Sequence, residues 1–325
     1  TANGEGERFI ECDYWSGQMM LEFYQELQGG KGPVFLKLDH LAEETIQTIE
    51  TILHGNERPS RGQFHAGRST DYRKDMVEMH ISEIGFCSGH SASGVHVNAK
   101  AETTVPGLYA VGDMAAVPHN YMLGAFTYGW FAGVNAAERA SQLDFSAIDQ
   151  DQIEAEKRRV YAPLLRDHGL PPLQVEYKLR RFVNDYLQPP KVTRKYEIGL
   201  KRFEEIGADI GHLHARNPHE LMRAAEVSVI RDCAEMAARA SLFRTESRWG
   251  LYHLRVDYPE RNDADWFCHA HLYKDAQGRM AHVKREIEPY IVPIDDTEKT
   301  AYDRLRISRD PAQASAQAQA VPAAA

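Results

Sequence analysis

A glycine followed by an aspartate closes the apolar segment TTVPGLYAVGD, which runs from Thr103 to Asp113. The segment predicts a tight turn, a short buried strand and a corner at Gly112 and Asp113. Glycine there lets the backbone approach a ligand closely, and the carboxylate can accept hydrogen bonds from sugar hydroxyls. A strand that ends in Gly-Asp is also a common structural corner, so the neighbouring segments decide between the two interpretations.

A predicted helix over residues 123–142 begins about ten residues after this corner. The free amide groups and positive dipole end of such a helix suit a ligand atom that gains negative charge. Small residues recur along it at helical spacing, among them Gly124, Ala125, Gly129, Gly133 and Ala136. Because glycine is costly inside a helix, this pattern predicts a backbone pressed close to a sheet or a cofactor.

Two histidines, His90 and His119, lie in loops on either side of this region. An imidazole with a pKa near neutrality can donate a proton or stabilise a developing anion. The chain has 15 histidines, so most of them must be ordinary surface or structural residues. His80 and His96 fall in predicted strands, where a hydrogen-bonded structural role is the default.

The elements that must position these residues can be located from apolar periodicity. Before the corner, the sequence predicts a helix over 17–27, a strand over 34–38, a helix over 43–53, a surface loop over 56–75 and short strands over 79–84, 95–97 and 107–111. After it come amphipathic stretches near 152–167, 173–187, 191–206 and 218–243, which predict a three- or four-helix bundle. Residues 246–292 predict strands with a hairpin turn at 274–279.

Composition excludes several classes of protein. The chain of 325 residues has a net charge of -9, which argues against a broad basic surface for nucleic acid. The sequence contains no run of about 20 apolar residues, which a membrane span would need. The four cysteines are far apart and form no CxxC, so any iron-sulfur centre must lie in a partner, and cytosolic thiols in a cytoplasmic protein are expected: Cys12, Cys87, Cys233 and Cys268.

Three segments together resemble the succinate dehydrogenase and fumarate reductase flavoprotein superfamily. TTVPGLYAVGD is similar to its second FAD-binding signature, TxxPGLYAxGD, which leads into a loop and a small-residue helix beneath the flavin ring. The loop from His119 to Gly129 resembles the His-x-aromatic-x-x-Gly loop of adenylylsulfate reductase alpha subunits. Residues 246–266, with ESR, DY and DADW, resemble the ESR...DY/F...D-x-x-W pattern near the end of the superfamily. The resemblance covers roughly residues 10 to 295.

The resemblance implies an α/β fold, α+β overall, and FAD as the cofactor. The implied domains are the remainder of a cap or substrate domain (1–75), the C-terminal part of an FAD-binding domain (76–145), a helical bundle (146–245), a small β-rich domain (246–295) and a partly disordered tail (296–325). His90 and His119, in loops that flank the predicted flavin face, are the candidate catalytic groups. The resemblance places cofactor contacts at Gly112, Asp113, Met122, Gly124, Ala125, Phe126 and Thr127.

Departures from the superfamily pattern narrow the expectation. Dicarboxylate enzymes of the superfamily carry one arginine in the loop before the flavin helix and another in the cap helix, whereas these positions hold Met122 and about Ser16. Without guanidinium groups, bidentate recognition of carboxylates is lost. The upstream GxGxxG fingerprint is also absent, so a complete FAD site is expected to need residues outside this chain, and the chain alone is expected to be inactive.

The resulting prediction is the C-terminal segment of an FAD-dependent oxidoreductase subunit that is similar to adenylylsulfate reductase. It would transfer electrons between a small substrate and a ferredoxin-like iron-sulfur subunit, and it would need the missing N-terminal FAD-binding region. The alternatives are a fumarate reductase or succinate dehydrogenase type of dicarboxylate enzyme and a non-catalytic interaction module. Arg248 and Arg255 could bind an anion or dock the helical domain, but pairing with Glu246, Asp257 or Asp263 is favoured.

Overall fold

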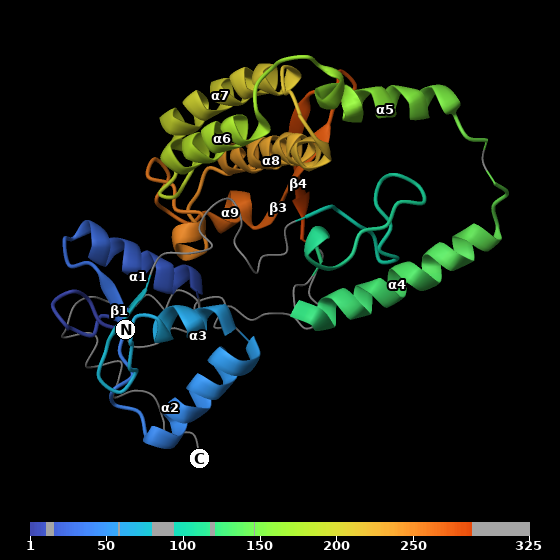
Figure 1. Ribbon diagram of the computed structural model, residues 1–325. Coiled ribbons are helices and arrows are strands. Elements are labelled where there is room, and N and C mark those ends of the chain that lie inside the picture. Colours follow the sequence, from blue (N-terminus) through green and yellow to red (C-terminus); the bar gives the residue numbers. More distant parts are fainter. Residues whose placement is uncertain (11–15, 58, 80–93, 118–120, 146, 288–325) are drawn as a thin grey trace.

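The computed structural model describes residues 1–10, 16–57, 59–79, 94–117, 121–145 and 147–287 (Figure 1). The chain begins with α1 (Ser16–Gln28) and β1 (Val34–Leu36), followed by α2 (Glu43–Glu50), which continues as the π-helical turn η1 (Thr51–Glu57). α3 (Pro59–Ala66) and β2 (Val77–Met79) complete this part. β1 and β2 pair antiparallel, with Val34 opposite Met79. The helices predicted at 17–27 and 43–53 and the strand predicted at 34–38 are therefore confirmed within a few residues.

A helix in the middle of the predicted loop 56–75 is a correction to the sequence analysis. α3 is held there by contact with a buried side chain, that of Tyr72. The Tyr72 Oη lies 2.8 Å from His54 Nε2 and 2.6 Å from His65 Nδ1, so one hydroxyl joins η1 to α3. Gly62 is buried against His54, where a Cβ would lie only 2.6 Å from the His54 Cβ. Long-range packing of this kind leaves no periodic signal in the sequence.

The segment 94–117 is mostly irregular and leads into the short 3-10 turn η2 (Gly112–Met114) and the long helix α4 (Tyr121–Ser141). The strand predicted over 107–111 is present only as isolated pairings, of Tyr109 with Glu102 and of Ala110 with Ala101. The partner segment turns away because the Asn98 side chain accepts hydrogen bonds from the N–H groups of Lys100 and Glu102. The predicted helix 123–142 is confirmed. No helix of the described segments is long and apolar enough to cross a membrane.

The helical part contains α5 (Gln150–Leu165), α6 (Pro172–Tyr186), α7 (Thr193–Gly211) and α8 (Pro218–Phe243), close to the predicted bounds. α6, α7 and α8 form the core of the bundle, while α5 contacts α8 and buries no residue completely (Figure 1). The rings of Phe182 and Phe203 meet edge to face at 4.9 Å between α6 and α7. The fully buried apolar side chains of this core include Leu179, Leu187, Tyr196, Phe203, Ile206 and Val227.

The C-terminal part contains the turn η3 (Gly250–Tyr252), the short helix α9 (Asp263–Trp266) and the antiparallel hairpin β3 (Cys268–Lys274) and β4 (Met280–Glu286). The predicted turn at 274–279 is confirmed. Asp275 closes it by accepting hydrogen bonds from the N–H groups of Gln277 and Arg279, and Gly278 supplies a positive φ of 76°. The hairpin lies along α8.

The two ends of the described chain share a second core. Leu251 of η3 packs into a buried cluster with Phe23 and Met20 of α1 and with Val34 of β1. η3 thus places the C-terminal part directly on α1. The N-terminal elements and the region after the bundle therefore form one packed unit, although more than 200 residues of sequence separate them.

Candidate functional site

The predicted corner at Gly112 is a sharp turn held against α4. Gly112 has a φ of +63° and begins η2, in which the Ala115 N–H donates to the Gly112 carbonyl. A Cβ at Gly112 would lie 3.4 Å from the Ala125 Cβ, so glycine allows both the left-handed backbone and the close approach to the helix. Asp113, the second residue of η2, is exposed. The structure therefore brings Gly112, Asp113 and Ala125 together.

A parallel segment behind the corner fixes its position. The Val95 N–H donates to the Met114 carbonyl, and the Ala116 N–H donates to the Val95 carbonyl, both at 2.8 Å. Gly94 allows this pairing, because a Cβ there would lie 2.5 Å from the Met114 oxygen. Ala110, Ala115 and Val117 form a small buried core beneath the turn. The corner is thus held by backbone hydrogen bonds on one side and by α4 on the other.

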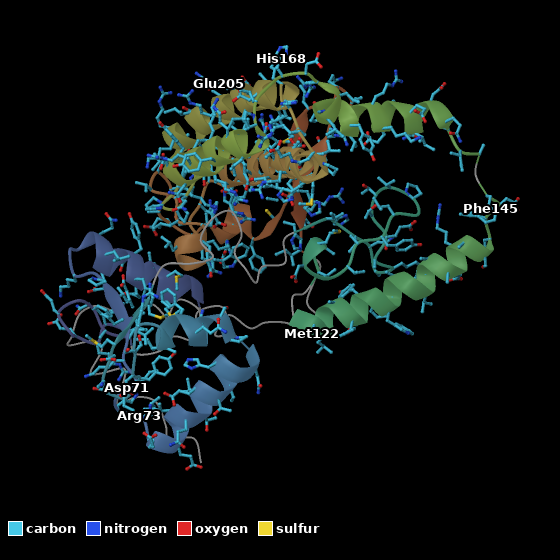
Figure 2. All side chains as sticks on the ribbon, viewed as in Figure 1. Asp71, Arg73, Met122, Phe145, His168 and Glu205 are labelled. Atoms are coloured by element: carbon cyan, nitrogen blue, oxygen red, sulfur yellow. The ribbon has the colours of Figure 1, made fainter. Side chains whose placement is uncertain are left out.

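The outer face of α4 carries large apolar side chains that nothing in the described segments covers. Met122, Phe126 and Trp130, each four residues from the next, are 69%, 69% and 65% exposed, and Met122 points away from the rest of the chain (Figure 2). A Cβ at Gly129 or Gly133 would meet no atom within 4 Å. Among the described residues, the predicted close packing is therefore present at Ala125, which meets the Gly112 turn, and absent at Gly129 and Gly133. An apolar face of this size is typical of a helix that another body covers.

These residues fit one side of a flavin site. An exposed carboxylate follows a glycine turn, the first turns of a helix lie beside it, and the helix presents apolar and aromatic side chains. Of the other predicted contacts, Gly124 is half-buried, while Met122, Ala125, Phe126 and Thr127 are exposed. His90 and His119, the predicted catalytic residues, lie outside the described residues.

Arg255 and Arg248, the two arginines considered in the sequence analysis, make contacts within the fold. Arg255 is 2% exposed and donates to the carbonyls of Ser241 and Arg244 at the end of α8, to Thr193 Oγ1 and to Asp257. It therefore caps α8 and ties it to the start of α7. The preferred alternative from the sequence is correct for Arg255, which both pairs with an aspartate and docks the bundle.

Arg248 pairs with a buried glutamate. Glu246 is completely buried and accepts hydrogen bonds from Arg244 at 2.7 Å, from Arg248 at 2.7 Å and from the Asn262 N–H at 2.9 Å. Burial raises the pKa of this carboxyl, but the hydrogen bonds from Arg248, Asn262 and Arg244 outweigh burial and hold the pKa below its usual value. Arg248 also reaches Asp263. The ESR segment is thus a buried ionic junction.

Sequence reasoning missed a buried lysine at the same junction. The Lys191 Nζ lies 2.9 Å from Ser241 Oγ and 3.2 Å from His253 Nδ1. Burial, with Arg255 close by, lowers the pKa of Lys191 to about 7. Burial and the neighbouring Lys191 lower the pKa of His253 to about 2, so this imidazole stays neutral. The sequence gives no sign of this burial, because Lys191 stands among polar residues next to a proline pair.

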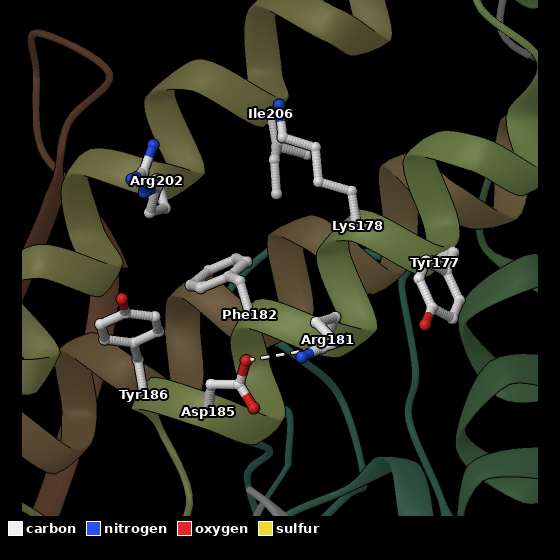
Figure 3. A pocket seen from close by; sticks show the side chains of 8 residues that line it. All are labelled: Tyr177, Lys178, Arg181, Phe182, Asp185, Tyr186, Arg202 and Ile206. Carbon is white, nitrogen blue, oxygen red and sulfur yellow. Dashed lines mark hydrogen bonds and ion pairs between the residues drawn. The ribbon is translucent and has the colours of Figure 1, made fainter.

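A surface pocket of about 370 Å³ lies on the bundle between α6 and α7. Figure 3 shows the Phe182 ring between the two helices. Two cationic side chains of the pocket are already paired, Lys178 with Asp209 at 2.6 Å and Arg181 with Asp185 at 3.4 Å. The pocket is lined by Tyr177, Lys178, Arg181, Phe182, Asp185, Tyr186, Arg202 and Ile206, none of them a predicted site residue.

Comparisons with known proteins confirm the resemblance. Residues 177–302 match the family model described as the fumarate reductase flavoprotein C-terminal region. The chain is 26% identical over 254 residues to an uncharacterized FAD-dependent oxidoreductase of Methanocaldococcus jannaschii. This alignment covers 75% of this chain and 44% of the relative. It is 22% identical over 324 residues to a succinate dehydrogenase flavoprotein subunit of Coxiella burnetii, covering 88% of this chain and 52% of the relative.

The fold of the chain also matches those of two solved reductase structures. Adenylylsulfate reductase from Archaeoglobus fulgidus superposes with a TM-score of 0.73 at 23% identity, covering 90% of this chain and 56% of that one. Quinol fumarate reductase from E. coli superposes with a TM-score of 0.69 at 20% identity. The predicted fold class is confirmed by these matches. The chain spans about half the length of the proteins it matches.

Proposed function

We propose that this chain, which is similar to the succinate dehydrogenase and fumarate reductase flavoproteins, is the C-terminal segment of an FAD-dependent oxidoreductase. The observation that carries the proposal is the arrangement of Gly112, Asp113 and α4. The turn approaches Ala125 to van der Waals distance while Asp113 and the second turn of α4 stay exposed. In this proposal, the flavin ring lies beside the corner.

Each residue of the corner has a task in this proposal. When FAD is bound, its flavin supplies hydride and electron transfer. Asp113 accepts hydrogen bonds from hydroxyl groups of the cofactor. The free N–H groups at the start of α4 stabilise negative charge near the ring. Gly124, Ala125 and Thr127 let the helix backbone come close, and Met122 and Phe126 keep water away.

We assign the proton-transfer role to His90 and His119. Both come from loops next to the corner in the sequence, and an imidazole can give or take a proton near neutral pH. The substrate in this proposal is a small molecule other than a dicarboxylate, because Met122 stands where that class of enzyme has an arginine and offers no bidentate donor. An adenylylsulfate reductase-like reaction fits this difference better than fumarate reduction.

The proposal also requires two partners. A dinucleotide-binding region must hold the rest of FAD, and the exposed apolar face of α4 gives it a surface to cover. The resemblance to adenylylsulfate reductase implies an iron-sulfur protein that gives or takes the electrons. Any cluster would lie in that partner, since the four cysteines of this chain are too dispersed in sequence to hold one by local spacing. The domain bounds given above are part of this proposal.

The test is the flavin content of the subunit purified together with its dinucleotide-binding region. Asp113→Ala is expected to lose most of the visible flavin absorbance, because the carboxylate no longer accepts hydrogen bonds from the cofactor. Asp144→Ala, in an exposed segment after α4, is the matched control and should keep its flavin. Equal flavin in both variants would contradict the site. It would favour the alternative of a non-catalytic module whose α4 face binds another protein.

A further inference from the structure

The β3–β4 hairpin has two faces of different character. One face packs against the bundle, where the His282 ring stacks on Phe243 at 4.7 Å and the Lys284 ammonium lies 3.6 Å from the centre of the Trp266 ring. The opposite face carries His269 and Arg285, which are direct cross-strand partners, and His271 two residues further along β3. Cross-strand partners and residues two apart share a face of a hairpin. Three basic side chains therefore lie together on this face.

A fourth basic side chain comes from the loop behind the Gly112 corner. The His96 ring lies 4.7 Å from the His271 ring, and the His271 ring lies 6.0 Å from that of His269. The irregular segment from 94 to 117 passes next to the hairpin (Figure 1). The cluster of His96, His269, His271 and Arg285, here called the histidine cluster, is thus built from two strands and a distant loop.

No acidic group balances this cluster within the described part of the chain. There, none of its four side chains makes a hydrogen bond or an ion pair with a carboxylate. Burial lowers the pKa of His271, and the neighbouring His96, Arg285 and His269 lower it further. Each of these neighbours is a base, so the groups repel one another when they are protonated. Such a cluster is stabilised by an anion that neutralises it.

A metal ion fits the cluster less well than an anion. Among the described residues, no group of three or more histidine, cysteine or acidic side chains has a geometry that could hold a metal. Arg285, a permanent cation, would also repel a metal ion. Imidazolium and guanidinium groups, in contrast, are both donors to oxyanions.

We propose that the histidine cluster binds a tetrahedral oxyanion of the phosphate or sulfate class between the loop of residues 94–98 and the β3–β4 hairpin. Arg285 supplies the fixed charge, and the imidazoles take up protons as the anion binds. His96 follows Val95, and the Val95 backbone is hydrogen-bonded to Met114 and Ala116, which come shortly after Asp113 in the sequence. An anion in the cluster would therefore tie the hairpin to the loop that supports the Gly112 corner. The site does not depend on the proposed flavin chemistry.

Titration calorimetry of the full chain with inorganic sulfate tests the proposal. Sulfate remains a dianion from pH 6 to pH 8, so any change in affinity comes from the protein. If the cluster takes up one proton as sulfate binds, the affinity for sulfate should be at least about tenfold lower at pH 8 than at pH 6, at constant ionic strength. Inorganic phosphate should compete with sulfate, which distinguishes an oxyanion site from one selective for sulfur.

Variants locate the site. Arg285→Gln should weaken sulfate binding by about tenfold at both pH values, and His96→Asn should reduce the dependence on pH. Both side chains are exposed, so these variants should fold. His168→Asn, in an exposed loop of the bundle, is the control and should bind as the parent does (Figure 2). The proposal is overturned if sulfate does not bind, if its affinity is the same at pH 6 and pH 8, or if Arg285→Gln binds like the control.

Discussion

Glu246 is the residue on which the C-terminal junction depends most directly. Its carboxylate neutralises two guanidinium groups in a place from which water is excluded. Glu246→Gln removes the charge but keeps the size. Among the ion pairs of the described residues, Arg248 then keeps Asp263, whereas Arg244 loses its carboxylate partner. Breaking a buried ionic group by removing one partner is expected to lower the free energy of unfolding by about 3 kcal/mol.

Urea unfolding of the chain measures this loss. Glu205→Gln is the matched control, because Glu205 pairs with Arg202 on the surface of α7 and such exposed pairs contribute less than about 1 kcal/mol. If both variants lose the same stability, Glu246 does not hold a buried junction.

Lys191 predicts an unusual dependence of stability on pH. Its pKa is lowered to about 7 in the folded chain by burial, while an unfolded lysine titrates near 10.5. Between these values the unfolded chain binds more protons than the folded one, so the contribution of Lys191 to stability rises with pH. Below pH 7 the lysine is protonated in both states, and its unfavourable contribution is then largest and constant.

Lys191→Met should remove this rise. From pH 7.5 to 9, the difference in unfolding free energy between parent and variant should shift in favour of the parent by up to about 1.4 kcal/mol per pH unit. Lys195→Met, an exposed lysine at the start of α7, should follow the parent at every pH. A constant difference between the parent and Lys191→Met would show that Lys191 stays protonated when folded.

At the scale of elements, α7 shows how one glycine sets the distance to a neighbouring segment. Gly199 faces Leu187, which is buried at the end of α6. A Cβ at Gly199 would lie 2.6 Å from a Leu187 methyl. Gly199→Ala should therefore force the core apart and destabilise the chain by about 1–3 kcal/mol, although alanine favours helix. Thermal unfolding followed by circular dichroism measures the change.

Gly207→Ala provides the opposite result on the same helix. The nearest atoms to its added Cβ belong to the flexible Arg231 side chain at 3.7 Å, so the gain in helix propensity of up to about 1 kcal/mol should remain. Stabilisation by both substitutions would mean that α6 and α7 do not pack as closely as described.

Local periodicity explains which elements the sequence could predict. α6, α7 and α8 have apolar side chains that repeat at helical spacing, and the Asp275 turn has the residues that a hairpin needs, so their positions are close to those expected. α3 depends on Tyr72 bridging two histidines, and the junction at Lys191 depends on residues far apart in the chain. Contacts of this range have no local pattern.

The candidate site divides in the same way. The Gly-Asp corner and the helix after it could be predicted, because both depend on residue types at fixed local spacing. The histidine cluster could not, since His96 and His271 meet only through the fold. A partial signal was present in the alternation of His269 and His271 along a predicted strand, which places both on one face.

At the scale of the whole molecule, the position of Leu251 makes the N-terminal elements depend on the C-terminal part. Leu251 is 1% exposed, and its side chain fills the core formed by α1 and β1 rather than the core of the bundle. Leu251→Ala should cost about 2–5 kcal/mol because it leaves a cavity there. The loss should be local to the shared core, since α6–α8 have a separate core of their own.

Hydrogen exchange measured by mass spectrometry can locate this loss. In Leu251→Ala, amides of α1 should exchange faster, while those of α7 and α8 keep the protection of the parent. Leu173→Ala, on the exposed side of α6, is the control and should change neither region. Faster exchange in α7 and α8 to the same extent as in α1 would mean that both cores unfold as one unit. Unchanged exchange in α1 would mean that the chain ends do not share a core.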